Sequence, residues 1–174
     1  IGLNPVKINM VVIRGVNDDE VTDFARLSIE KGWHVRFIEP MPFVNDTTFS
    51  FVPISEVIER LRVLGDLKPY PFSNGNGPAK YYKFAGASGT IGFISPMSEC
   101  FCSSCNRLRL TVDGMLRPCL MSDYELDLKS ALRNGGSFSD IKQCLLLAIA
   151  AKPERYTLVK GQSQKGRAMC QLGG

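Results

Sequence analysis

The sequence predicts an α/β protein that continues into a smaller α+β extension, and three observations lead to this prediction. Residues 7–39 form a strand, helix and strand pattern with short links, which is the βα arrangement found in parallel sheets and barrels. Residues 106–151 form a β-hairpin pattern followed by two amphipathic helices. Of the 174 residues, 44% are hydrophobic and 22% charged, which is typical of a globular chain with a buried core and excludes disorder, collagen and coiled coil.

The βα arrangement begins with the apolar run 7–13, which predicts a buried strand. Residues 17–20, Asn-Asp-Asp-Glu, are typical of a helix start, and apolar residues then recur with helical spacing as far as Gly32. The run 34–39 predicts a second buried strand. Two strands cannot close a barrel, so a barrel would need further strands from outside this region.

A second helix is predicted over residues 55–64 from its apolar spacing. The segment 66–80 is rich in Pro, Gly, Asn and Ser, which indicates a loop and a candidate domain boundary. We therefore expect domains at 1–65 and 66–174. The predicted elements of the second domain are strands at 81–84, 90–94, 106–112 and 115–120 and helices at 126–133 and 140–151.

Charge and hydropathy narrow the functional classes only slightly. With 21 basic and 17 acidic residues, the net charge of +4 suits an anionic small molecule as well as nucleic acid. The longest apolar run, 144–151, is too short to span a bilayer, so no membrane association is expected. No basic run with interleaved aromatic residues is present, and nucleic-acid binding is not expected. The first residue, Ile1, indicates a part of a longer protein.

Three of the six cysteines form the pattern Cys-x2-Cys-x13-Cys, at Cys102, Cys105 and Cys119. A Cys-x2-Cys turn directs two thiolates at one metal. An Asp-Gly hairpin between the second and third cysteines folds the chain back, so that the third thiolate can reach the same metal. Thiolates suit zinc or an iron–sulfur cluster. Clustered cysteines favour metal binding over disulfides and a reducing compartment, the cytoplasm or an organelle matrix.

The identity of the metal depends on a fourth ligand. Structural zinc would need one more protein donor, for which Cys100, Cys144, Cys170, the lone His34 or a carboxylate is available. A four-iron cluster needs only these three cysteines and leaves one iron open to another ligand. Buried apolar cysteines without metal are the remaining alternative.

Arg107 and Arg109 directly follow the Cys-x2-Cys turn. On a strand they share one face, which forms either a phosphate clamp or an ordinary solvated face. An ideal two-residue Asp-Gly turn pairs Cys119 with Leu108, on the opposite face. A shared site would therefore lie at the strand ends, or need a bulge at Pro118.

Other candidate residues lie in the first two strands. Lys7 begins a strand predicted to be buried, and an anionic ligand would satisfy its charge, although an ordinary strand-edge lysine is the alternative. Arg36 raises the same question, with Glu39 as a candidate salt-bridge partner. Met41, taken alone, is interpreted as a core or loop methionine. His34 has no nucleophile nearby in the sequence, and no role is assigned to it.

Four segments resemble one known family. FCSSCNRLRLTVDGMLRPCL is similar to the C-terminal signature of molybdenum cofactor biosynthesis protein A, the radical S-adenosylmethionine enzymes called GTP 3′,8-cyclases. KINMVVIRGVNDDEV and HVRFIEPMP resemble late barrel strands of that family, and GRAMCQLGG resembles its double-glycine end. The resemblance implies the C-terminal part of an incomplete radical S-adenosylmethionine (β/α) barrel, with a cluster-binding extension.

The resemblance also implies a reaction and its cofactors. Family members carry two [4Fe-4S] clusters: the N-terminal one binds S-adenosylmethionine and generates a radical, and the C-terminal one contacts GTP. The radical abstracts a ribose hydrogen, and the ribose carbon then attacks the guanine C8. The product, 3′,8-cyclo-7,8-dihydro-GTP, passes to a downstream cyclic pyranopterin monophosphate synthase, and a homodimer is expected.

Roles are carried over by matching positions. GTP and S-adenosylmethionine are expected toward opposite ends of the barrel, because Lys7 begins its strand while Arg36 and Met41 lie toward or beyond the end of theirs. The implied sites are a cluster at Cys102, Cys105 and Cys119, GTP at Lys7, Arg107, Leu108 and Arg109, S-adenosylmethionine at Arg36 and Met41, and an active-site tail at Gly173 and Gly174.

This chain departs from the family pattern in one major respect. It contains no Cys-x3-Cys-x2-Cys motif, so we expect these 174 residues alone to lack the radical-generating cluster and to be catalytically inactive. Two alternatives remain: a zinc-ribbon-like binding module completed by Cys100, and the auxiliary-cluster domain of a different radical enzyme.

Overall fold

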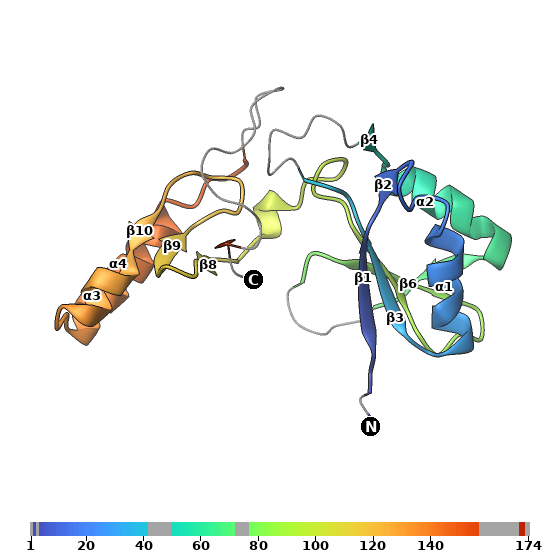
Figure 1. Ribbon diagram of the computed structural model, residues 1–174, viewed down its shortest axis with the longest axis horizontal. Helices are drawn as coiled ribbons and strands as arrows, with labels where there is room; N and C mark the ends of the chain where they lie inside the picture. Colours follow the sequence, from blue (N-terminus) through green and yellow to red (C-terminus); the bar gives the residue numbers. More distant parts are fainter. Residues whose placement is uncertain (1, 3, 42–49, 72–76, 157–170, 173–174) are drawn as a thin grey trace. The chain divides into compact units, whose positions relative to one another are not determined.

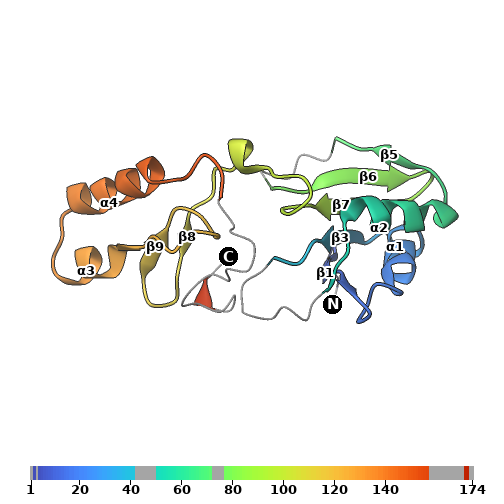
Figure 2. The same ribbon diagram turned by 90° about the horizontal axis from the view of Figure 1, so that it is seen from above.

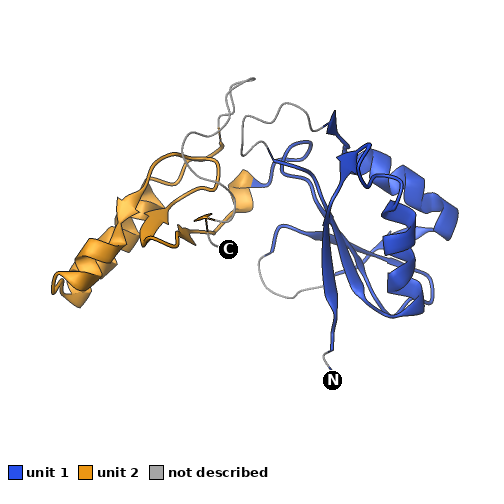
Figure 3. Cartoon of the chain, in the orientation of Figure 1, with its two compact units in different colours: residues 1–41, 47–101 blue, residues 42–46, 102–174 orange. Residues whose placement is uncertain are grey.

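The chain is divided into two compact units, which are described separately. The computed structural model describes residues 2, 4–41, 50–71, 77–156 and 171–172. Unit 1 holds the described residues as far as Phe101, and unit 2 those from Cys102 onward (Figure 3). This division differs from the boundary expected after residue 65, because strands between residues 67 and 94 belong to the same sheet as the first strands.

Unit 1 is built on a five-stranded sheet (Figure 1), in which the strands have the order β1-β3-β7-β6-β5. Strands β1, β3 and β7 are parallel, whereas β6 is antiparallel to both β7 and β5. The predicted βα arrangement is therefore confirmed, since β1 and β3 are parallel neighbours joined through helix α1. The strands are β1 (Lys7–Val11), β3 (His34–Ile38), β5 (Leu67–Pro69), β6 (Lys80–Phe84) and β7 (Ile91–Ile94), with a separate pair β2 (Ile13–Arg14) and β4 (Ser50–Phe51).

Helices α1 (Val21–Glu30) and α2 (Ile54–Leu61) pack on one face of this sheet, and a 3₁₀ turn, η1 (Arg62–Leu64), follows α2 (Figure 2). Alternate strand residues form the core with them. The core contains Met10, Val35, Phe37, Ile91 and Phe93 from the sheet and Val21, Ala25, Val57 and Leu61 from the helices. The other face carries no described helix, and there the side chains of Lys7, Asn9 and Val11 are exposed. Strand β1 is thus buried on one face only, not throughout as predicted.

The polar residues before α1 form a turn instead of capping the helix. Asn17 accepts a hydrogen bond from the Ile13 amide at 2.8 Å and donates one to the Val11 carbonyl at 2.9 Å. Asp18 accepts one from the Gly15 amide at 2.6 Å. The N-cap of α1 is Glu20, whose side chain makes no capping hydrogen bond.

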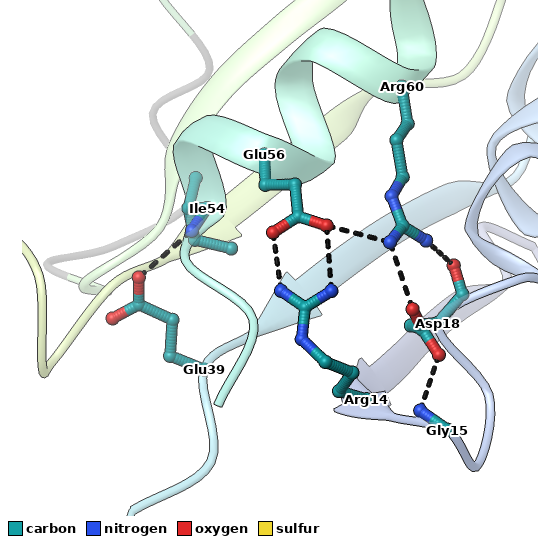
Figure 4. A network of polar contacts seen from close by, with 7 residues as sticks. All are labelled: Arg14, Gly15, Asp18, Glu39, Ile54, Glu56 and Arg60. Atoms are coloured by element: carbon teal, nitrogen blue, oxygen red, sulfur yellow. Dashed lines mark hydrogen bonds and ion pairs between the residues drawn. The ribbon is translucent and has the colours of Figure 1, made fainter. Parts of the chain in front are cut away.

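A network of two arginines and two carboxylates joins this turn to helix α2 (Figure 4). Glu56 lies between Arg14 and Arg60, at 2.5 Å from Nη2 of the first and 2.7 Å from Nη2 of the second. Arg60 also contacts the carboxylate of Asp18 at 2.9 Å. The network holds the start of α1 against α2.

Unit 2 contains a small antiparallel sheet and two helices. The sheet has the order β10-β9-β8, with β8 at Arg109–Leu110, β9 at Met115–Arg117 and β10 at Leu126–Asp127. Helices α3 (Leu128–Arg133) and α4 (Phe138–Ala150) confirm the two predicted helices, and a 3₁₀ turn, η2, covers Cys102–Ser104. The core of unit 2 is Leu116, Leu128 and Ala148 with Leu108, Leu126, Ile141 and Cys144. No helix in the described part of either unit has the length and apolar character needed to cross a membrane.

Candidate functional site

The hairpin that carries Arg109 has a loop one residue longer than that of the ideal two-residue Asp-Gly turn. Its loop has three residues, because the Thr111 amide donates to the Met115 carbonyl at 2.9 Å across the turn. Gly114 supplies the left-handed conformation that such a loop needs, with φ of +87°. The resulting ladder pairs Leu110 with Leu116 and Arg109 with Arg117.

This shift by one residue changes which side chains share a face. The ladder ends at the Arg109–Arg117 pair; continued outward, its register would set Cys119 opposite Arg107, on the face of Arg109, instead of opposite Leu108. Leu108 packs with Leu116 in the helix-covered core, on the other face. The extra residue of the hairpin thus lies in the turn, and the chain bends at Pro118, just beyond the last pair of the ladder.

Electrostatics also connect these residues. Burial lowers the pKa of Arg109, and the neighbouring Arg107 lowers it further, whereas the thiols of Cys105 and Cys119 act in the opposite direction. Two cysteines from different parts of the sequence thus lie within electrostatic range of one guanidinium. A half-buried arginine beside another arginine is a favourable place for an anion.

The cysteines themselves are half-buried, and none of the described ones forms a disulfide. Cys102 and Cys105 are joined by a turn in which the Cys105 amide donates to the Cys102 carbonyl at 3.1 Å. The sulfur of Cys119 accepts a hydrogen bond from the Met121 amide at 3.4 Å. These donors have the right chemistry for an iron–sulfur cluster.

The geometry of a complete metal site is not present, however. Within the described ranges, no three Cys, His, Asp or Glu side chains are gathered as they would be around a metal ion. The convergence of all three thiols on one cluster stays a prediction. Cys144 packs in the helix core of unit 2 with Leu116 and Ala148, which makes it a structural cysteine.

Arg117 holds the segment that follows Cys119. Its side chain is only 2% exposed, and its guanidinium donates to the Ser122 carbonyl and forms ion pairs with Asp123 at 3.5 Å and Glu125 at 3.4 Å. Sequence reasoning missed this residue, because an arginine on a short hairpin strand normally indicates a solvated face.

The open face of the unit 1 sheet carries the other candidate residues. Lys7 pairs in register with His34, and Asn9 pairs with Arg36. Lys7 is exposed, so its charge does not need a partner in the way that a buried lysine would. Arg36 lies at the middle of β3, whereas the sequence predicted a position toward the end of that strand. Met41 lies beyond the end of the strand, as predicted, and is half-buried.

Arg36 is held in place by two neighbouring strands. Its guanidinium carbon lies 5.8 Å from the centre of the Tyr81 ring, a cation–π arrangement. Gly92 provides the space, because a Cβ there would stand 3.0 Å from the Arg36 Cγ. The buried Nε of Arg36 has no hydrogen-bond partner in the described part of the chain. A buried N–H donor of this kind suits a polar or anionic ligand.

Several cations act together on this face. The pKa of His34 is lowered by burial first, and then by Lys7, Arg36 and Lys83. The His34 ring nitrogen Nδ1 lies 2.8 Å from the Thr90 hydroxyl, which orients the imidazole. Lys83 was missed by sequence reasoning. Its place in β6 gives no signal until the strand order is known.

Glu39 does not pair with Arg36, contrary to the candidate salt bridge. The two residues point to opposite faces of the strand, since Glu39 is fully buried on the helix side. Its carboxylate accepts hydrogen bonds from the Ile54 amide at 3.0 Å (Figure 4) and from the Met97 and Ser98 amides at 3.0 and 2.9 Å. It therefore ties the end of β3, just before Met41, to helix α2 and the loop after β7.

Two sequence-predicted residues cannot be placed. Gly173 and Gly174 lie outside the described residues, as does Cys170. Their suggested roles are therefore unaffected by the geometry above.

Comparison with known proteins identifies the class of protein and then the family. Residues 33–158 match the family described as Molybdenum Cofactor Synthesis C, so the chain belongs to that family. The chain is 48% identical over 177 residues to the GTP 3′,8-cyclase of Pelotomaculum thermopropionicum, with 99% of this chain and 54% of the relative covered. It is 46% identical to that of Moorella thermoacetica (99% and 54% covered) and 46% identical to that of a Picosynechococcus species (100% and 55% covered).

Within that family, the relatives named here are all GTP 3′,8-cyclases, and the chain is similar to them over almost its whole length. It spans about half the length of the curated relatives that it matches. The resemblance inferred from sequence motifs is thereby confirmed, including its limitation to one half of the family's length.

Proposed function

We propose that this chain is the half of a GTP 3′,8-cyclase that binds GTP and the second iron–sulfur cluster. The reaction of the whole enzyme would be the conversion of GTP to 3′,8-cyclo-7,8-dihydro-GTP in molybdenum cofactor biosynthesis. The observation that supports the proposal best is the hairpin register, which, continued beyond the Arg109–Arg117 pair, would set Cys119 on the same face as Arg107 and Arg109. Family membership over almost the whole chain supports it.

The proposed cluster ligands are Cys102, Cys105 and Cys119. A [4Fe-4S] cluster held by three thiolates would offer one iron without a protein ligand. The chain's own contribution would be to position the sulfurs: a 3₁₀ turn relates the first two, and the Met121 amide donates a hydrogen bond to the third.

Arg107 and Arg109, with the backbone at Leu108, would bind the nucleotide beside the cluster. The guanidinium forks match phosphate oxygens and can bind them in pairs. Burial of Arg109 favours this role, because a ligand anion would offset the cost of keeping its charge out of water.

The open face of the unit 1 sheet carries the other proposed ligand-binding residues. Lys7 would bind GTP, while Arg36 and Met41 would contact S-adenosylmethionine. The unpaired Nε of Arg36 and the surrounding positive charge support an anionic or carboxylate-bearing ligand there. In this proposal the parallel strands are the last part of an incomplete (β/α) barrel, whose earlier strands come from the other half of the enzyme.

Catalysis would depend on that other half. It would supply S-adenosylmethionine chemistry on its own [4Fe-4S] cluster, for which the motif Cys-x3-Cys-x2-Cys is absent from these 174 residues. The chain alone should therefore bind GTP without converting it. The assembled enzyme would act as a homodimer in the cytoplasm or an organelle matrix, with the double-glycine tail entering the active site, and pass its product to a cyclic pyranopterin monophosphate synthase.

The direct test is GTP binding by the anaerobically reconstituted chain, measured by calorimetry together with iron content. Replacing Arg107 or Arg109 by Ala should weaken GTP binding roughly 10- to 100-fold, the loss of one charge-assisted contact, and leave iron content unchanged. Arg133→Ala, on the exposed surface of α3, is the control. Unchanged binding in both site variants would contradict the clamp, and loss of iron instead would assign these arginines a structural role. Formation of 5′-deoxyadenosine by the chain alone would contradict its proposed inactivity.

A further inference from the structure

A lysine outside the motif region connects the two segments that carry the proposed ligands. Lys152 lies just beyond the end of helix α4, and its side chain is half-buried. Its ammonium group donates to the Arg107 carbonyl at 2.8 Å and to the Pro118 carbonyl at 2.9 Å. One acceptor belongs to a proposed nucleotide-binding residue, and the other immediately precedes the proposed ligand Cys119.

These contacts lie where the hairpin ladder stops. The outermost pair of β8 and β9 is Arg109 with Arg117. Beyond it, the two arms of the hairpin continue toward Cys105 on one side and Cys119 on the other. Lys152 bonds to both arms in this region, so its ammonium joins them where the ladder does not. Charge-assisted hydrogen bonds of this type are stronger than those between neutral groups.

The helix behind Lys152 makes it a rigid anchor. Helix α4 starts at a complete capping box, in which Ser137 and Asp140 bond reciprocally. Ala148 is fully buried against the sheet of unit 2, and the Lys152 amide donates to the Ile149 carbonyl at 3.1 Å. The lysine backbone is therefore fixed by the helix, and the ammonium group can hold two loop segments at a set separation.

A second cation fixes the far side of the Cys119 segment. Arg117 bonds to the Ser122 carbonyl, while Lys152 bonds to the Pro118 carbonyl. Cys119 is thus held between two cation-to-carbonyl contacts, one on each side in the sequence.

We propose that Lys152 is a positioning residue, which sets the spacing between the Cys105–Arg107 arm and the Cys119 arm. The inference rests on the proposed function for what these arms bind, but the spacing itself is a property of the chain without ligands. Lys152 touches backbone carbonyls only, so it acts through the residues that it holds in place.

The first test measures thiol reactivity in the metal-free, reduced chain. Alkylation rates of individual cysteines are followed by mass spectrometry for Lys152→Met, which keeps the apolar stem and removes the charge. We expect alkylation of Cys105 and Cys119 to become roughly three- to tenfold faster, because opening of the two arms no longer has to break the hydrogen bonds from Lys152. The alkylation rate of Cys144 should not change. Lys142→Met, exposed on the same helix, is the control and should change none of these rates.

Two results of this test would overturn the proposal. Rates at Cys105 and Cys119 that match those of Lys142→Met would show that the contacts position nothing. An equal acceleration at Cys144 would show general loosening of unit 2, as expected for a merely structural residue. Lys152→Arg, which keeps the charge and the donors, should restore rates close to those of the unaltered chain.

The second test measures GTP affinity of the reconstituted chain in a double-mutant cycle with Lys152→Met and Arg107→Ala. If Lys152 acts through the Arg107 arm, the combined loss should be smaller than the product of the single losses by about threefold or more. Independent losses would contradict positioning through this arm. A chain that binds no GTP but shows the expected alkylation pattern would refute the proposed function and support the positioning role.

Discussion

Replacing Glu39 by Gln tests how the end of β3 is held. The fully buried carboxylate accepts hydrogen bonds from three backbone amides, those of Ile54, Met97 and Ser98, and from the Ser98 hydroxyl. Glutamine has the same shape but only one acceptor oxygen. Its least costly orientation directs the NH2 group at the Ile54 amide, because the Ser98 hydroxyl can rotate and accept.

The cost follows from that geometry. One buried amide donor left without a partner costs about 1–3 kcal/mol, and loss of charge assistance in the remaining bonds costs about 1 kcal/mol more. We therefore expect the free energy of unfolding of unit 1 to fall by about 2–4 kcal/mol. The lone tryptophan, Trp33, lies in unit 1 and reports its unfolding in urea by fluorescence.

A matched substitution separates this effect from a general loss of charge. Glu59 has a side chain that is 66% exposed and pairs with Arg62 three residues away on the surface. Glu59→Gln should change stability by less than about 0.5 kcal/mol. If Glu39→Gln is no more destabilising than Glu59→Gln, the reasoning about the buried carboxylate is refuted.

Three further predictions concern both units. The pKa of His34 lies below its ordinary 6.5, so the unfolded chain binds more protons between the two values. The stability of unit 1 should therefore fall as pH drops below about 6.5. A bound triphosphate should raise the pKa of His34 measured by NMR. A His34 pKa at or above the ordinary value in the chain without ligand would contradict this reasoning. Gly114→Ala should destabilise unit 2 more than Gly135→Ala. Both substitutions force alanine into a left-handed backbone, which costs about 1–2 kcal/mol, but only the new Cβ at position 114 would meet the Lys129 side chain, at 2.6 Å. Equal melting temperatures of the two variants would contradict this prediction. Glu56→Gln should lower the melting temperature slightly at low salt and less at about 1 M NaCl, and a salt-independent effect would argue against the ion-pair network.

Element types were predictable from the sequence because local patterns determine them. The apolar runs at 7–13 and 34–39 and the helical spacing between them are sufficient to predict β1, α1 and β3. The domain boundary was not predictable from composition. A stretch rich in Pro and Gly indicated a linker over 66–80, but pairing of β5 with β6 spans that stretch within one sheet. Strand pairing is a non-local property, and composition does not report it.

The candidate site divides in the same way. Residue types and spacing were enough to select Cys102, Cys105, Cys119 and the adjacent arginines. The register of the hairpin, and with it the face predicted for Cys119, depends on a single residue in the turn, where the Thr111 hydroxyl bonds to Asp113 and Met115 and favours the longer loop. No local pattern distinguishes the two turns.

Contacts to backbone carbonyls are the hardest to foresee. Lys152 and Arg117 bind the backbone of distant or buried segments, and a carbonyl carries no side-chain signature. The opposed directions of Arg36 and Glu39, by contrast, follow from the alternation of a strand. That correction was therefore available from the sequence.

The central claim is that three thiols of this chain hold one iron–sulfur cluster. The most direct measurement is iron, acid-labile sulfide and zinc content after anaerobic reconstitution, for the chain and for single Cys→Ser variants. We expect about four iron and four sulfide per chain, lost on substitution of Cys102, Cys105 or Cys119 and retained in Cys144→Ser. Zinc without sulfide, or iron content that does not depend on these three cysteines, would contradict the account.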